Sequence, residues 1–84
     1  MKTEIIKMLY AANKNGVKGL DTSAILENLF RANKKKINVE QLFNLFQELL
    51  NKKLIVEVEA ENMKSIHFEI TGKGISSYLK SKLN

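Results

Sequence analysis

A lysine between two glycines, Gly72-Lys73-Gly74, is the stretch of this chain that comes closest to a chemistry-bearing motif. A phosphate-binding loop needs another glycine five positions before Gly72 and a serine or threonine directly after the lysine. His67 and Gly74 occupy those positions, so this stretch is not such a loop. It lies between a strand-like and a helix-like run, where Thr71 can accept hydrogen bonds from the N–H groups that follow. We expect both glycines to turn the chain where a side chain would obstruct it.

The second candidate for chemistry is His67, the only histidine of the chain. Strand alternation predicts that it lies on an outer, acidic face with Glu57, Glu59 and Glu69, opposite Glu57 or Glu59 according to the loop length. These residues include donors for a divalent metal, but a solvated face with one ion pair is the commoner result of such a pattern. With one histidine and no cysteine, we expect no catalytic site, no metal, no cofactor and no small-molecule substrate.

Length and composition narrow the class of protein. The 84 residues form one domain with a thin core. The absence of cysteine excludes disulfides and is typical of a reducing compartment. The charged N-terminus lacks the apolar segment of a signal peptide, and no apolar run approaches the roughly 20 residues that span a bilayer. These features predict a soluble cytoplasmic protein without a membrane partner.

The charge balance indicates the kind of partner. Lys and Arg total 14 against 9 Asp and Glu, which gives a net charge of +5, and all the cations except Arg31 are lysines. Such an excess favours polyanions through counterion release, although a lysine-rich surface also serves solubility.

Apolar periodicity predicts helices near residues 3–14, from Asp21 or Thr22 onward, from Asn38 to about 52, and over 72–84. Asn15-Gly16 supplies a left-handed stop, and Asn38 with Gln41 forms a capping pattern. The stripes of the second and third helices are the following apolar residues: Ile25, Leu26, Leu29 and Phe30, then Val39, Leu42, Phe46, Leu49 and Leu50.

Two alternating runs, 54–60 and 66–71, predict a β-hairpin whose tip lies at Met63 and Lys64. We expect Val56 and Val58 on the first strand, and Ile66, Phe68 and Ile70 on the second, to face the core. Residues 17–20 are read only as a short extended connection.

The run NVEQLFNLFQELLNKKLIVEV, followed by IHFEITGKGISSYL, resembles the core of winged helix-turn-helix DNA-binding regulators. Their signature of a wing strand followed by Thr-x-x-Gly-x-x-x-Leu corresponds here to Phe68, Ile70, Thr71, Gly74 and Tyr78-Leu79. EIIKMLYAANKNGVKGL is similar to the opening of small archaeal winged-helix regulators and chromatin-associated proteins. The resemblance covers most of the chain and implies a mainly α, α+β single domain over 1–84. Its parts are a three-helix core (1–53), a two-stranded wing (54–71) and a C-terminal helix (72–84).

The resemblance implies a nucleoid-associated regulator or chromosomal protein that binds double-stranded DNA by occupancy. Its third helix would enter the major groove, where Gln41 and Asn44 are suited to adenine. Phosphate contacts are expected from five cations: Lys34, Lys35, Lys36, Lys64 and Arg31. The carboxylates Glu40 and Glu48 lie on the same helix face without a cation. The alternative is a protein-interaction module that uses the acidic wing and the amide-rich helix.

Apolar residues of the last helix predict an assembly. Ile75, Leu79 and Leu83 recur at every fourth position, with Tyr78 beside them. They either close the small core or form a two-fold interface, and we expect a homodimer with this edge in its interface.

Overall fold

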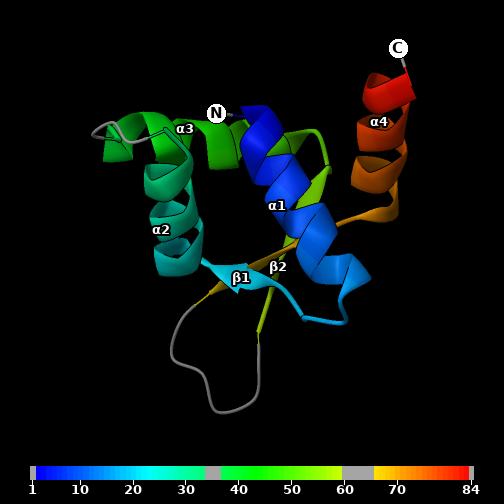
Figure 1. Cartoon of the computed structure of the whole chain (residues 1–84), viewed down its shortest axis with the longest axis horizontal. Coiled ribbons are helices and arrows are strands. Elements are labelled where there is room, and N and C mark those ends of the chain that lie inside the picture. The colour runs from blue at the N-terminus through cyan, green and yellow to red at the C-terminus, as the bar shows by residue number, and fades with distance from the viewer. Residues whose placement is uncertain (1, 34–36, 60–65, 84) are drawn as a thin grey trace.

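A computed structural model describes residues 2–33, 37–59 and 66–83 of the chain. The elements, in order, are α1 (Lys2–Lys14), β1 (Leu20–Asp21), α2 (Thr22–Asn33), α3 (Val39–Asn51), β2 (Ile55–Val58), β3 (His67–Ile70) and α4 (Gly72–Leu83). In Figure 1, α1 lies in the middle, with α2 and α3 on one side and α4 on the other. The predicted mainly helical α+β class is confirmed. None of the helices in these ranges is both long and apolar enough to cross a membrane.

Local hydrogen bonds set the start and end of the first two helices. Gly16 has a φ of 78°, and the Val17 N–H donates to the Ala12 carbonyl at 2.9 Å, so the predicted left-handed stop of α1 is confirmed. At the start of α2 the Ala24 N–H donates to Asp21 Oδ1 at 2.8 Å. Asp21, rather than Thr22, is therefore the cap.

The third helix is capped at both ends. The side chain of Asn38 accepts from the Glu40 N–H at 2.9 Å and the Gln41 N–H at 3.3 Å, which confirms Asn38 as the N-cap. At the other end Lys53 takes a φ of 60°, and the Leu54 N–H donates to the Leu49 carbonyl at 3.0 Å. A lysine thus occupies a left-handed position that favours glycine.

Thr71 joins the end of α3 to the start of α4. Its N–H donates to the Leu54 carbonyl at 3.0 Å, and its hydroxyl donates to the Lys53 carbonyl at 2.6 Å. The same hydroxyl accepts from the Gly74 N–H at 3.0 Å, so the predicted capping role of Thr71 is confirmed. A Cβ on Gly74 would overlap the Leu54 carbonyl oxygen, whereas a Cβ on Gly72 would meet nothing within 4 Å. The expected obstruction is therefore correct for Gly74 and wrong for Gly72.

The sheet has one strand more than the sequence predicts. β1 pairs with β3, with Leu20 opposite Phe68, so the antiparallel order is β1-β3-β2 rather than a two-stranded hairpin. Gly19 permits this approach, since a Cβ there would lie 3.0 Å from the Phe68 carbonyl oxygen and its φ is +76°. A strand of two residues is too short to show alternation, and this explains why periodicity missed it.

The inward face of β2 is the opposite of the predicted one. Ile55 lies opposite Ile70 and both are buried, whereas Val56 is 44% exposed and Val58 only half-buried. On the second strand Phe68 is buried as expected, but Ile66 is 53% exposed. Side chains alternate between the two faces of a strand. Placing Ile55 inward instead of Val56 therefore exchanges the inward and outward faces for every later residue of β2.

His67 is buried, contrary to its predicted outer position. It lies opposite Val58, and Glu57 lies opposite Phe68, so neither predicted pairing of the histidine with Glu57 or Glu59 forms. His67 is 6% exposed, and its Nδ1 has no hydrogen-bond partner among the described residues. The predicted acidic face is also divided, because Glu57 and Glu69 fall on opposite faces of the sheet.

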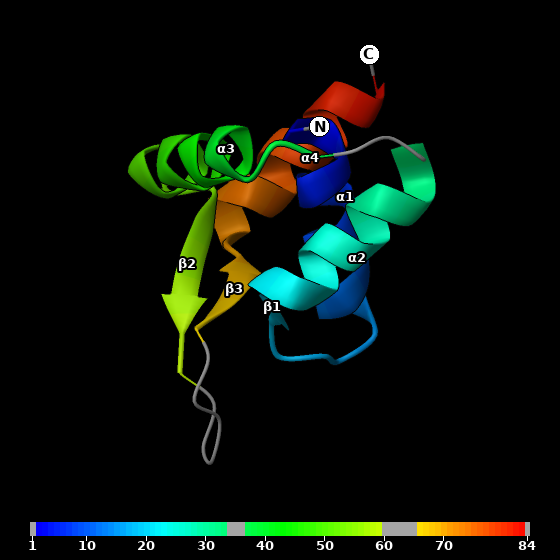
Figure 2. The same ribbon diagram turned by 90° about the vertical axis from the view of Figure 1, so that its left-hand side faces the viewer.

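The core lies between the helices and one face of the sheet. Its buried apolar residues come from α1, α2, α3, β2 and β3: Ile5, Ile6, Leu9, Ile25, Leu29, Leu42, Phe46, Leu49, Ile55, Phe68 and Ile70. Phe46 stacks on Phe68 with ring centroids 4.6 Å apart. Figure 2 shows α3 above the sheet and β2 descending away from the helices. The stacking of Phe46 on Phe68 fixes which side of α3 faces outward.

Candidate functional site

The side of α3 opposite the core carries a row of amides. We call Glu40, Gln41, Asn44, Gln47, Glu48 and Asn51 the outer face of α3. All of them are exposed except Glu48, which is half-buried. Positions three or four apart are neighbours on a helix surface, so Gln41, Asn44 and Gln47 form a continuous strip. The two candidate base-reading residues, Gln41 and Asn44, are therefore brought together on an accessible surface.

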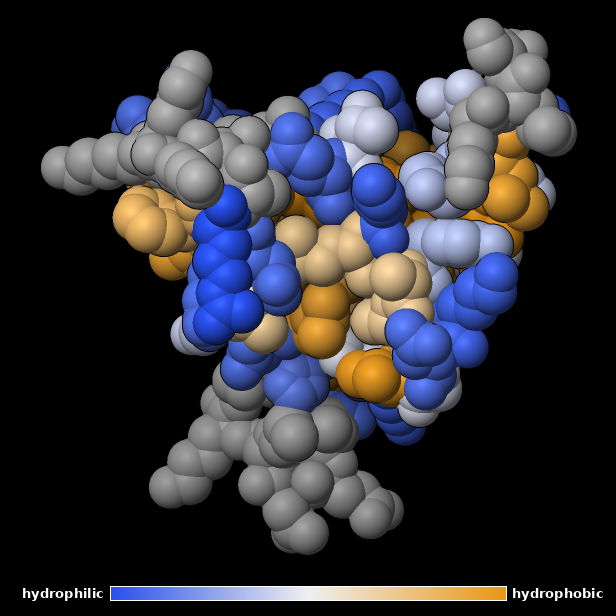
Figure 3. All heavy atoms as spheres, in the orientation of Figure 1, coloured by the Kyte–Doolittle hydropathy of each residue, from blue (hydrophilic) through white to orange (hydrophobic). Residues whose placement is uncertain are grey.

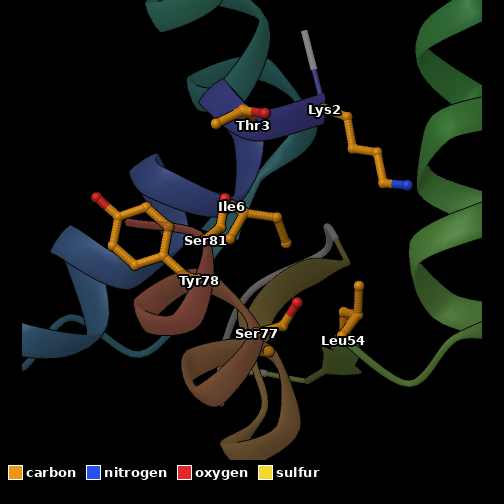
Figure 4. A pocket seen from close by; sticks show the side chains of 8 residues that line it. Lys2, Thr3, Ile6, Leu54, Ser77, Tyr78 and Ser81 are labelled. Atoms are coloured by element: carbon orange, nitrogen blue, oxygen red, sulfur yellow. The ribbon is translucent and has the colours of Figure 1, made fainter. Parts of the chain in front are cut away.

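Glu48 on this face is neutralised by two lysines. Lys2 Nζ lies 3.2 Å and Lys52 Nζ 3.1 Å from Glu48 Oε1. The hydrogen bond from Lys52 and then that from Lys2 hold the pKa of Glu48 below its ordinary value. Figure 4 shows Lys2 extending from α1 toward α3. Because Lys2 is distant from Glu48 in the sequence, spacing gave no signal of this contact, and the expected lack of a cation on this face is wrong.

Two further charged residues, one on this face and one on α2, have local explanations. Glu40 lies in the first turn of α3, where a carboxylate is stabilised by the helix dipole. Arg31, a predicted phosphate contact, lies on α2 and donates to Glu27 at 2.6 Å. Both members of this pair are exposed, with 72% and 63% of their side chains accessible. An exposed pair of this kind contributes little, so Arg31 can exchange it for a phosphate at small cost.

The other predicted phosphate contacts lie outside the described residues. Lys34, Lys35 and Lys36 occupy the connection between α2 and α3, and Lys64 and Met63 the connection between β2 and β3. The sequence positions of the three consecutive lysines place them between the last residue of α2 and the Asn38 cap of α3.

Three large apolar side chains on α2 and α3 are exposed although two of them belonged to predicted core stripes. Phe30 is 56% and Val39 is 51% exposed, so both stripe assignments are wrong. Phe43, predicted at the margin of the third-helix stripe, is 54% exposed. Figure 3 shows apolar atoms on the surface at the left edge, beside the region where Figure 1 draws α2 and α3. The helices have wider apolar faces than the small core covers.

The predicted interface on α4 is divided between the core and the surface. Ile75 and Tyr78 are half-buried and pack against the core of the same chain. Tyr78 also lies on Tyr10, with ring centroids 4.8 Å apart. Leu79 is 40% exposed, and the side chain of Leu83 is outside the described part of the structure.

A cavity of about 170 Å³ lies between α1, α4 and Leu54 in the connection from α3 to β2 (Figure 4). Among the described residues, its lining includes the hydroxyl side chains of Thr3, Ser77 and Ser81 but neither a carboxylate nor His67. Within the described residues no group of three His, Cys, Asp or Glu side chains is placed to hold a metal ion. The amide strip of α3 is therefore the surface on which a functional interpretation rests.

Comparison of the chain with protein-family models, with curated proteins and with solved structures finds no match. The α+β class follows from the observed helices and antiparallel sheet. The function of the outer face of α3 is inferred from its own residues.

Proposed function

We propose that this chain is a winged helix-turn-helix protein that binds double-stranded DNA. In this proposal α2 and α3 form the helix-turn-helix, β2 and β3 form the wing, and α3 enters the major groove. The protein acts by occupancy, as a transcriptional regulator or a small chromosomal protein, and is nucleoid-associated in the cytoplasm. The element order and the net charge of +5 support this function.

One observation carries the proposal: the amide strip of α3 is exposed while the adjacent carboxylate of Glu48 is held by Lys2 and Lys52. Asparagine and glutamine can each form two hydrogen bonds with adenine in the major groove. A free carboxylate beside that strip would repel DNA phosphates, and the two lysines remove much of that repulsion. The Asn38 cap holds the N-terminal turn of α3, which penetrates deepest in such complexes.

The second candidate is a protein-interaction module built on the same fold. The observation that favours it is the exposure of Phe30, Val39 and Phe43, because apolar side chains on a surface are common in protein interfaces. The absence of any salt-dependent binding to duplex DNA would select this candidate over the first.

A salt titration tests DNA binding. We expect the logarithm of the binding constant to fall linearly with the logarithm of salt concentration. Replacing Lys34, Lys35 and Lys36 by alanine should weaken binding to all sequences alike and reduce the slope by up to about 0.9 for each phosphate that is no longer neutralised. Fluorescence anisotropy with a labelled duplex at several salt concentrations measures both quantities.

The matched control removes the same charge elsewhere. Lys7 and Lys14 on α1 and Lys80 on α4 are exposed, and their triple alanine variant lowers the net charge equally. We expect this variant to keep most of the wild-type slope. If both triple variants reduced the salt slope equally, net charge alone would matter. If the slope were unchanged in the Lys34, Lys35 and Lys36 variant, these lysines would not be part of the interface.

The proposal includes a homodimer in which the α4 edge, Ile75, Tyr78, Leu79 and Leu83, lies at the interface. Two copies would place two recognition helices on neighbouring half-sites and double the phosphate contacts. We expect wild type to sediment as a dimer at micromolar concentration and Leu79→Asp to sediment as a monomer, because the substitution buries a charge in the interface.

Val17→Asp is the control for this measurement, since Val17 is 47% exposed in the connection that follows α1. It should remain a dimer. A monomeric wild type would mean that Ile75 and Tyr78 only close the core of their own chain.

A further inference from the structure

Phe43 and Val39 form a solvent-facing apolar row in the N-terminal half of α3. They are 54% and 51% exposed and lie four residues apart, so the two side chains are neighbours on the helix surface. Phe43 lies beside the amide strip of the outer face, because Gln47 is four residues after it, and Val39 lies beside Phe43. This is the half of a recognition helix whose side chains reach the base edges.

The ring of Phe43 has polar neighbours of a particular kind. Gln47 is four residues after Phe43 and three after Asn44, so it is a surface neighbour of both and joins the ring and the two amides into one patch. All three are exposed. An aromatic ring and two amides are thus available to one ligand at the same time.

An A·T base pair offers groups that match this patch. Adenine presents N7 and N6 in the major groove, which an amide side chain can bind with two hydrogen bonds, and thymine presents an apolar 5-methyl group. Guanine is bound chiefly by arginine or lysine, and α3 contains neither between Val39 and Asn51. The chemistry of the helix therefore favours A·T over G·C.

We infer that α3 reads A·T base pairs, with Phe43, supported by Val39, in contact with the 5-methyl group of thymine. This inference rests on the proposed DNA binding and adds to it the class of sequence that is bound. The net charge of +5 and the neutralised Glu48 favour a nucleic acid over a protein as the occupant of this patch. The row also explains why large apolar side chains are left exposed at this position of α3.

Three duplexes of equal length test the inference in one titration. The first alternates dA and dT, the second carries deoxyuridine in place of every thymidine, and the third alternates dG and dC. The second differs from the first only by the missing methyl groups. We expect wild type to bind the thymine duplex roughly fourfold more tightly than the uracil duplex for each methyl group buried, and roughly tenfold more tightly than the dG–dC duplex.

Two phenylalanine variants locate the methyl contact. Phe43→Ala should bind the thymine and uracil duplexes equally while keeping the wild-type salt dependence. Phe30→Ala is the control, because Phe30 is as exposed as Phe43 but lies on α2. Phe30→Ala should keep the wild-type ratio of the affinities for the thymine and uracil duplexes. Thermal unfolding of both variants should match wild type, since neither ring is part of the core.

The outcomes separate this inference from the proposed function. Salt-dependent binding to all three duplexes with equal affinity for thymine and uracil would leave DNA binding intact and overturn the methyl contact. The methyl contact would also be overturned if Phe30→Ala lost the preference for the thymine duplex over the uracil duplex while Phe43→Ala kept it. No binding to any duplex would overturn the proposed function itself and leave the apolar row to a protein partner.

Discussion

Gly74→Ala should destabilise the protein by about 3 kcal/mol or more, the range of severe overpacking. A Cβ at this position would overlap the Leu54 carbonyl oxygen and lie 2.7 Å from Ile70 Cγ1. The carbonyl cannot withdraw easily, because it accepts a hydrogen bond from the Thr71 N–H at 3.0 Å. The total stability of a domain of this size is about 4–13 kcal/mol, so the substitution removes a large share of it.

Gly72→Ala is the matched control, two residues earlier in the same turn. A Cβ there meets nothing within 4 Å, and alanine has a better helix propensity than glycine. We expect its free energy of unfolding to stay within about 0.5 kcal/mol of wild type or to rise slightly. Urea denaturation followed by circular dichroism measures both variants. Similar stabilities for the two would show that α4 does not approach Leu54 as closely as described.

Phe46→Ala should cost about 3–5 kcal/mol, because it removes a buried ring and leaves a cavity. Phe46 is 2% exposed and stacks on Phe68 at 4.6 Å, so it joins α3 to the central strand of the sheet. The destabilisation should appear as a lower urea midpoint. A variant that partly unfolds should also bind DNA of every sequence more weakly.

Phe43→Ala provides the comparison within the same helix. Phe43 is three residues before Phe46 but 54% exposed, and its truncation should change the free energy of unfolding by about 0.5 kcal/mol or less. If the two substitutions were equally destabilising, the orientation of α3 would be wrong, and with it the outer face. Because Phe43→Ala should leave the stability unchanged, a change in its DNA binding can be assigned to the loss of the Phe43 ring.

The sequence alone predicted the elements and their boundaries where the signal is local. The left-handed turn at Gly16, the Asn38 cap and the Thr71 cap are each set by hydrogen bonds between residues within five positions of one another. The exposure of Gln41 and Asn44 also follows from the periodicity of α3, because the strongest apolar stripe, Leu42, Phe46 and Leu49, lies opposite. The order of the predicted helices and strands, together with the composition, was therefore enough to predict the α+β class.

Tertiary packing decided the faces of the sheet. Ile55 and Val56 are adjacent and both suit an inward position, so alternation could not choose between them. The pairing of Ile55 with Ile70 made the choice and placed His67 opposite Val58. The third strand, β1, arises from its pairing with β3, and its two residues are too few for a pattern to predict it.

The Lys52–Glu48 pair is four residues apart, so helical spacing could have predicted it, whereas the contact of Lys2 with Glu48 and the apolar margin of the candidate site were decided by tertiary structure. Lys2 reaches Glu48 only because the fold brings the start of α1 near α3, and no spacing rule joins residues so far apart in the chain. Val39 and Phe43 remain exposed because the small core is filled by Leu42, Phe46 and Leu49 before the whole apolar face of α3 is covered. The residue types on α3 were set by the sequence, and the fold determined which of them are exposed on its outer side.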